Sequence, residues 1–265
     1  MKRLPLVLLT SFLFVLAGCY TNPVTGRQSL VLVQPSEELA LGAQSFQKIR
    51  ADEKVSTDSA MNARVRRVGE RIAGVVGSQM PNAQWEFVVF DSKEVNAFAL
   101  PGGKVGVYSG LLKLAASDDE LATVMGHEIG HVIARHGAER MSEQMVIQKV
   151  GELGAAIAQT KYSAETVQLA EVAYGAGTTV MRVLPHSRDN ESEADHMGVV
   201  FAAKAGYNPE AAITFWEKMS QQKTSGSGPF EKFLSTHPAD AQRIADLRAL
   251  MPEVKPIYEA NRGRF

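Results

Sequence analysis

The five residues His127-Glu128-Ile129-Gly130-His131 constrain the fold of this chain more than any other feature. Residues four apart share one face of an α-helix, so both imidazoles can bind one metal ion while Glu128 reaches a water molecule on that ion. Ser117-Asp118-Asp119-Glu120 is typical of a capped helix start, and apolar residues recur at helical spacing after it. The pattern therefore predicts a helix over 118–136 that carries two metal ligands and a general base. Two surface histidines on a charged helix are the alternative, which the apolar neighbours fit poorly.

A third metal ligand is expected from elsewhere in the chain, because a catalytic zinc typically has three protein ligands and one open position. The acidic segment Asn190-Glu191-Ser192-Glu193-Ala194-Asp195 is the best source. On a helix Glu191 and Asp195 share a face, so Glu191 could bind the metal while Asp195 hydrogen-bonds a ligand histidine. Glu193 would point away from the metal. Without the histidine motif upstream, a solvated acidic helix start would be the more ordinary interpretation.

The rest of the pattern predicts a mainly helical α+β domain. Runs of apolar and β-branched residues at 85–90, 95–100 and 104–108 predict three strands, which we expect to form a small antiparallel sheet. Helical spacing predicts further helices at 35–50, 58–76, 111–116, 138–159, 164–183, 190–205, 209–220 and 238–250. Hydrophobic residues make up 45% of the chain, so a real core is expected.

The N-terminus predicts a bacterial lipoprotein signal. Met1-Lys2-Arg3 is a short positive stretch, and 4–17 is nearly all apolar but too short for a comfortable membrane span. Leu16-Ala17-Gly18-Cys19 resembles the lipobox, at which signal peptidase cuts before a cysteine that is then lipidated, and Cys19 is the only cysteine. Tyr20 in place of an aspartate favours the outer membrane. We therefore expect a lipid anchor at Cys19 on a periplasm-facing protein; an ordinary cleaved signal beside a stray cysteine is the alternative.

Four ordered blocks resemble the membrane-associated zinc metallopeptidases of family forty-eight, which include HtpX-like and CAAX-protease-like enzymes. The blocks are Asn96-Ala97-Phe98-Ala99-Leu100-Pro101-Gly102-Gly103, the 127–137 segment, Ser187-Arg188 leading to 191–195, and Ser235-Thr236-His237-Pro238. Size and lipobox make the short LoiP-type bacterial lipoproteins the closest match. The resemblance implies a gluzincin fold with one zinc ion on His127, His131 and Glu191. It also implies an endopeptidase for misfolded or unassembled envelope proteins, with the outer-membrane assembly machinery as a possible partner.

The same resemblance suggests roles for residues outside the central motif. Zinc would lower the pKa of its bound water, while Glu128 moves a proton from that water to the leaving amine. The resemblance places His237 and Arg243 near the metal, where either could stabilise the oxyanion; a helix-cap neighbour and a surface charge are the ordinary alternatives. In related proteins this histidine can also sit over the zinc and block it. One departure is His186, where the family often carries an aromatic residue, and we expect it to be a bystander.

Substrate binding is expected at Asn96 and at the hairpin around 101–103, because an edge strand can pair with an extended peptide. An ordinary structural hairpin is the alternative, which we prefer for Gly102 and Gly103. His136 and His196 lack a partner at metal-ligand spacing and are expected to be structural.

The predicted organisation is a signal peptide at 1–18, a lipidated tether at 19–34, a catalytic domain at 35–252 and a polar tail at 253–265. Ser225-Gly226-Ser227-Gly228 is expected to be a flexible connector. A net charge of -1 provides no electrostatic reason to expect a nucleic acid as partner. Two rival functions stay open: a catalytically silent, chaperone-like lipoprotein in outer-membrane assembly, and a zinc amidase acting on cell-wall peptide. Glu128 beside both histidines argues against the silent protein.

Overall fold

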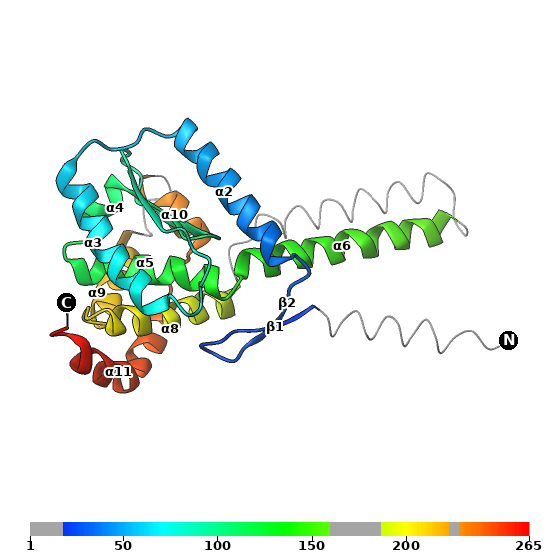
Figure 1. Ribbon diagram of the computed structural model, residues 1–265. Coiled ribbons are helices and arrows are strands. Elements are labelled where there is room, and N and C mark those ends of the chain that lie inside the picture. Colours follow the sequence, from blue (N-terminus) through cyan, green and yellow to red (C-terminus); the bar gives the residue numbers. More distant parts are fainter. Residues whose placement is uncertain (1–17, 160–186, 223–227, 265) are drawn as a thin grey trace. The chain divides into compact units, whose positions relative to one another are not determined.

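The computed structural model describes residues 18–159, 187–222 and 228–264 (Figure 1). The chain forms two compact units. The smaller comprises Met1–Asn22, Gly26–Gln34 and Gly137–Leu184, and the larger Pro23–Thr25, Pro35–His136 and Pro185–Phe265. The helix predicted at 164–183, His186 and most of the 225–228 connector lie outside the described residues. Within the described ranges, no helix combines the length and the apolar character that crossing a membrane requires.

The larger unit is mainly helical with one small sheet, which confirms the predicted α+β class. Its helices are α2 (Pro35–Asp52), α3 (Ser59–Val76), α4 (Ser109–Leu114), α5 (Asp118–Ile133), α8 (Arg188–Lys204), α9 (Ala211–Gln221), α10 (Glu231–Thr236) and α11 (Ala241–Asn261). Sequence patterns predicted all of these except α10, a short helix of six residues.

The sheet contains β3 (Glu86–Phe90), β4 (Ala97–Leu100) and β5 (Lys104–Tyr108) in the order β3-β5-β4. β4 and β5 form the expected antiparallel hairpin, whose turn needs the positive φ of Gly102 and Gly103. The expectation of a wholly antiparallel sheet is wrong, because β3 and β5 pair in parallel. The chain reverses direction between β3 and β4 and again between β4 and β5. β5 therefore runs parallel to β3, and in the sheet it lies between the two other strands.

Helix α5 lies at the centre of the larger unit, where it packs against α8, α3 and β4 (Figure 1). Its apolar side chains Leu121, Met125 and Ile129 are almost fully buried. The backbones of α5 and α8 meet at two glycines: a Cβ placed on Gly126 would lie 2.8 Å from the carbonyl oxygen of Gly198. This close approach brings the acidic segment of α8 against the histidine motif of α5.

The helix predicted over 118–136 ends earlier, at Ile133. Arg135 has a φ of 59°, a left-handed conformation that L-residues seldom adopt and that cannot continue the helix. Its guanidinium is held by Glu38 of α2, with Nε 2.8 Å from Oε1. A new helix, α6 (His136–Gln159), begins at the next residue, so His136 does not belong to the helix that carries the motif.

The polar tail predicted at 253–265 is also wrong, because α11 continues to Asn261. Pro252 and Pro256 each remove a backbone donor from this helix and crowd the carbonyl four residues earlier. The side chains of Met251 and Val254 are buried in the core, and their burial stabilises the helix beyond the predicted end at Leu250.

In the smaller unit, the segment predicted as a tether forms an antiparallel hairpin of β1 (Cys19–Thr21) and β2 (Gln28–Leu30). The two residues Val31 and Val33 after the hairpin pack on Ala138 of α6. The backbone N–H of Leu32 donates to Ser142 Oγ at 2.8 Å, and Arg27 forms a two-pronged ion pair with Glu139. The second half of the predicted tether, from Arg27 to Val33, therefore contacts α6 and is not free.

Candidate metal centre

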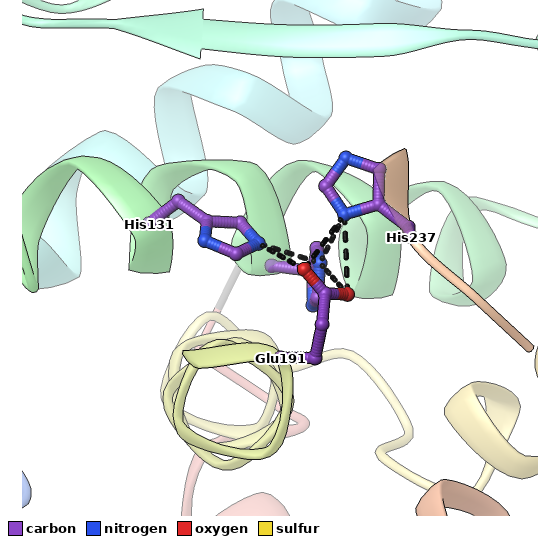
Figure 2. A group of neighbouring side chains, drawn as sticks. His131, Glu191 and His237 are labelled. Carbon is purple, nitrogen blue, oxygen red and sulfur yellow. Dashed lines mark hydrogen bonds and ion pairs between the residues drawn. The ribbon is translucent and has the colours of Figure 1, made fainter. Parts of the chain in front are cut away.

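Two imidazoles of α5 and one carboxylate of α8 converge in the interior of the larger unit. His127 and His131 are 2% and 7% exposed, and their Nε2 atoms lie 3.0 Å apart. Glu191 is 1% exposed, with Oε1 3.2 Å from His131 Nε2 and Oε2 3.5 Å from His127 Nε2. Figure 2 shows the Glu191 carboxylate pointing at the His131 ring. The structure thus brings together the three residues that the sequence predicts as metal ligands.

These separations fit a zinc ion. In a tetrahedral site with metal–ligand bonds of about 2.0–2.2 Å, neighbouring ligand atoms lie roughly 3.3–3.5 Å apart. The observed distances between the two imidazole nitrogens, and from each nitrogen to its nearer Glu191 oxygen, are 3.0–3.5 Å. His127, His131, Glu191 and His237 each direct one ligand atom into a cluster that spans no more than 4.8 Å.

The charges around the cluster also suit a dication. Glu128, Glu191 and Asp195 are buried carboxylates, and Arg243 is the buried guanidinium that faces two of them. Burial lowers the pKa of His127, but the Asp195 and Glu191 carboxylates outweigh it and raise the pKa to about 10. The raised pKa means that His127 holds a proton, and so the site attracts positive charge. A bound metal ion would supply that charge in place of the His127 proton.

Asp195 contacts the proposed ligand His127, and Arg243 contacts the proposed ligand Glu191. Asp195 Oδ1 lies 2.8 Å from His127 Nδ1, a close contact although the ring N–H is poorly aligned for a hydrogen bond. Arg243 donates from Nε and Nη2 to both oxygens of Asp195, at 2.7 and 2.8 Å, and its Nη1 lies 2.9 Å from Glu191 Oε2. The guanidinium also stacks over Trp216, 3.8 Å from the ring centroid. Arg243 therefore lies beside the candidate metal centre, near which the resemblance placed it. Its guanidinium nitrogens contact the carboxylates of Asp195 and Glu191.

Glu128 has the position that a general base requires. It is 5% exposed, and burial raises the pKa of its carboxyl above the ordinary value. Its Oε1 has no hydrogen-bond partner among the described residues and lies 3.5 Å from His237 Nε2. A buried carboxylate oxygen without a partner is costly, which is typical of an atom that awaits a ligand or substrate.

His237 lies within ligand distance of the cluster (Figure 2). Its Nδ1 is 3.2 Å from His127 Nε2 and 3.1 Å from Glu191 Oε1. The short helix α10 positions it: the His237 N–H donates to Phe233 O at 2.8 Å, and the two rings pack at 4.8 Å between centroids. His237 therefore lies beside the three residues that the sequence predicts as metal ligands.

The remaining predicted positions lie outside the cluster. Asn96 immediately precedes β4, an edge strand of the described sheet that packs against α5. Its Oδ1 accepts from the N–H of Ala97 at 3.0 Å, and its carbonyl accepts from Tyr108. Cys19 is exposed at the start of β1. Substrate binding by Asn96 and lipidation of Cys19 stay predictions.

Two residues beside the centre were not identified from the sequence. His136 was expected to be structural, yet its Nδ1 lies 2.7 Å from His131 Nδ1, and its Nε2 lies 2.9 Å from Glu193 Oε2. Glu193 was expected to point away from the metal; it lies outside the four-residue cluster, but it is buried and contacts His136. The two histidines are five positions apart, and that spacing places them on different faces of a continuous helix. Only the helix break at Arg135 brings His136 to the His131 ring. The periodicity of the sequence does not reveal this break.

Comparison with known proteins places this geometry in context. The profile described as Peptidase family M48 matches residues 59–251, a range that includes every member of the metal cluster. Mitochondrial metalloendopeptidase OMA1 of Saccharomyces cerevisiae is 29% identical over 252 residues, which cover 89% of this chain and 70% of that protein. OMA1 of Schizosaccharomyces pombe is 35% identical, over 74% of this chain and 55% of that protein. The beta-barrel assembly-enhancing protease of Escherichia coli is 30% identical, over 89% of this chain and 48% of that protein. The chain thus spans from about half to seven-tenths of these relatives.

Proposed function

The chain belongs to peptidase family M48 and is a metalloendopeptidase, and on that premise we propose that its metal is zinc and its substrates are misfolded or unassembled proteins of the bacterial cell envelope. The observation that carries the proposal is the convergence of His127, His131 and Glu191 on one point beside the buried Glu128. Two imidazoles and one carboxylate are the ligand set of many catalytic zinc sites.

The chemistry divides between the ion and the side chains around it. A bound zinc ion would lower the pKa of a water molecule and polarise the scissile carbonyl. Glu128 takes a proton from the attacking water and passes it to the amide nitrogen, whose bond to the carbonyl carbon breaks. The raised pKa of Glu128 suits both steps, because a stronger base accepts the proton more readily near neutral pH.

His237 has two roles in this proposal. While its Nδ1 stays 3.1–3.2 Å from two of the ligands, it fills the position that water or substrate needs. Turnover therefore requires the ring to move out of the cluster, and a ring that has moved can donate to the oxyanion. Arg243 holds Glu191 and Asp195 in place, because its nitrogens are already occupied by these two carboxylates and by the carbonyl of Pro238.

We assign substrate recognition to the edge of β4 that pairs with no other described strand. An extended peptide that pairs with this strand is recognised through its backbone, so unfolded segments of many sequences can bind. Asn96 stands at the start of that edge. The name of the Escherichia coli relative, a beta-barrel assembly-enhancing protease, supports envelope proteins as the substrate class and the assembly machinery as a partner.

The casein experiment tests the proposed reaction. Purified zinc-loaded protein is expected to cut casein into fragments. Glu128→Gln keeps the size of the side chain but removes the base. We expect this variant to bind zinc as tightly as the wild type and to cut casein at least about a hundredfold more slowly. Peptidoglycan incubated in parallel should stay intact. Equal casein cleavage by Glu128→Gln would contradict the role of Glu128, and release of cell-wall peptides without casein cleavage would favour the zinc amidase.

Location depends on Cys19, which we propose is lipidated and anchors the protein to the outer membrane, facing the periplasm. Expression in a bacterium with an outer membrane, followed by membrane fractionation, tests this proposal. The wild-type chain should sediment with outer membranes. Cys19→Ser should appear in the soluble periplasmic fraction or keep its signal peptide uncleaved. An identical distribution of both proteins in the outer-membrane fraction would contradict the anchor. Cys19 is exposed, so the substitution itself should leave the fold unchanged.

A further inference from the structure

A chain of buried polar groups lies behind His131, on the side away from the ligand cluster. His136 is fully buried, with Nδ1 2.7 Å from His131 Nδ1 and Nε2 2.9 Å from Glu193 Oε2. Glu193 is 6% exposed, and its Oε1 accepts a hydrogen bond from the hydroxyl of Thr25. All four residues belong to the larger unit.

With Glu193 ionised and His136 neutral, one arrangement of protons satisfies the contacts that lead from Glu193 to His131. The Glu193 carboxylate can only accept, so His136 presents an N–H at Nε2. A neutral His136 then has a bare lone pair at Nδ1, which must accept from an N–H at His131 Nδ1. His131 consequently has its own lone pair at Nε2, the atom that lies 3.2 Å from Glu191 Oε1 and 3.0 Å from His127 Nε2. That tautomer is the one a metal ligand needs.

We propose that Glu193 and His136 are positioning residues that hold His131 in its metal-binding tautomer and ring orientation. The proposal rests on the proposed metal site, since it assigns a role toward the ion that this site would bind. It extends the role of the acidic segment of α8, in which Glu191 belongs to the ligand cluster and Asp195 contacts the other histidine.

The two ligand histidines are supported in different ways. Asp195 contacts the His127 ring directly, whereas Glu193 reaches His131 only through the intervening imidazole of His136. The helix break at Arg135 makes this possible, because it places His136 at the start of α6 and behind the motif. A purely structural pair of buried groups would stabilise the fold equally well, so the test needs a measurement that reports on the metal ligand itself.

Three substitutions separate these possibilities. His136→Leu removes the acceptor for His131, while His136→Asn keeps an amide oxygen near the position of Nδ1. Glu193→Gln keeps the size of the side chain, but its amide can also donate, so the tautomer of His136 is no longer imposed. His196→Asn is the matched control, because His196 lies on the same helix as Glu193 and its Nε2 lies 4.0 Å from Glu253, which is outside the cluster.

Zinc affinity is measured by competition with a chromophoric chelator, the cobalt(II)-loaded protein is examined by visible absorption, and the melting temperature of each metal-free protein is recorded. We expect His136→Leu and Glu193→Gln to weaken zinc binding about ten- to hundredfold and to change the cobalt spectrum. His136→Asn should recover part of the affinity, and His196→Asn should match the wild type.

The inference is overturned if Glu193→Gln and His136→Leu bind zinc within about twofold of the wild type, even if their metal-free forms melt at lower temperatures. If His136→Leu does not fold, the nearly isosteric Glu193→Gln decides the question alone. A wild-type protein that binds no zinc would overturn the proposed metal site itself, so the two failures are distinguishable.

Discussion

At the scale of single residues, the three acidic side chains of 191–195 each have a different relation to the buried histidines. Glu191 joins the ligand cluster, Asp195 lies 2.8 Å from His127 Nδ1, and Glu193 contacts His136. Burial alone would raise the pKa of Asp195, but Arg243 and His127 together lower it below its ordinary value. The carboxylate is therefore charged at neutral pH, as support for a metal-bound imidazole requires.

Replacement of Asp195 by Asn should weaken the metal site without removing a ligand. The amide lacks the charge that stabilises the His127 ring, and it leaves Arg243 with one carboxylate fewer. We expect zinc affinity to fall about ten- to hundredfold, measured by chelator competition. Asp189→Asn on the exposed start of the same helix is the control and should bind zinc as the wild type does. Unchanged affinity in Asp195→Asn would show that Arg243 and Glu191 suffice.

At the scale of elements, the contact between α5 and α8 determines whether the metal site forms. Each helix carries part of the ligand set, and the two backbones approach at Gly126 and Gly198. A Cβ on Gly198 would lie 2.8 Å from the backbone nitrogen of His127, so the close approach occurs at the first ligand itself. Small residues here are needed for the ligands to reach one another.

The variant Gly126→Ala tests this contact. The new methyl group would meet backbone atoms of Gly198, which cannot move aside as a flexible side chain can. We expect a loss of about 1–3 kcal/mol in the free energy of unfolding, measured by denaturant titration, and weaker zinc binding. Gly74→Ala in α3 is the control: a Cβ there meets nothing within 4 Å, and the helix propensity of alanine should stabilise the protein slightly. Equal stability of both variants would contradict the proposed role of the close approach.

At the scale of the whole molecule, the metal is expected to contribute to folding as well as to catalysis. The proposed ligands come from α5 and α8, and the supporting Arg243 comes from α11, so a bound ion connects segments far apart in the sequence. Without the ion, the buried carboxylates around the site have fewer positive charges to stabilise them. Metal binding and folding are then coupled.

Removal of the metal should therefore lower the melting temperature. If zinc is present at about a thousandfold excess over its dissociation constant, binding contributes about 4 kcal/mol, which corresponds to roughly 10 °C for a protein of this size. Differential scanning calorimetry before and after dialysis against a chelator measures the effect. Added zinc should restore the transition, and added magnesium should not, because it prefers oxygen ligands. An unchanged melting temperature in protein shown to be free of metal would contradict the coupling.

The sequence alone determined the features that depend on local spacing. The histidine motif, its capped helix, the acidic segment and the three strands all follow from periodicity and end signals within a few residues, and their positions agree with the structure. Local spacing also identified the three proposed ligands, because the metal requires particular atoms from particular residue types. The positions of His237 and Arg243 near the centre were predicted only through the resemblance to a known family.

Tertiary packing alone decided the rest. The parallel pairing of β3 with β5, the burial that extends α11 and the contacts of 27–33 with α6 depend on partners distant in the sequence. The same holds for His136 and Glu193, which are 57 positions apart and meet because the helix breaks at Arg135 and α8 packs closely on α5. Helical periodicity describes one element at a time, whereas these contacts arise from how elements pack.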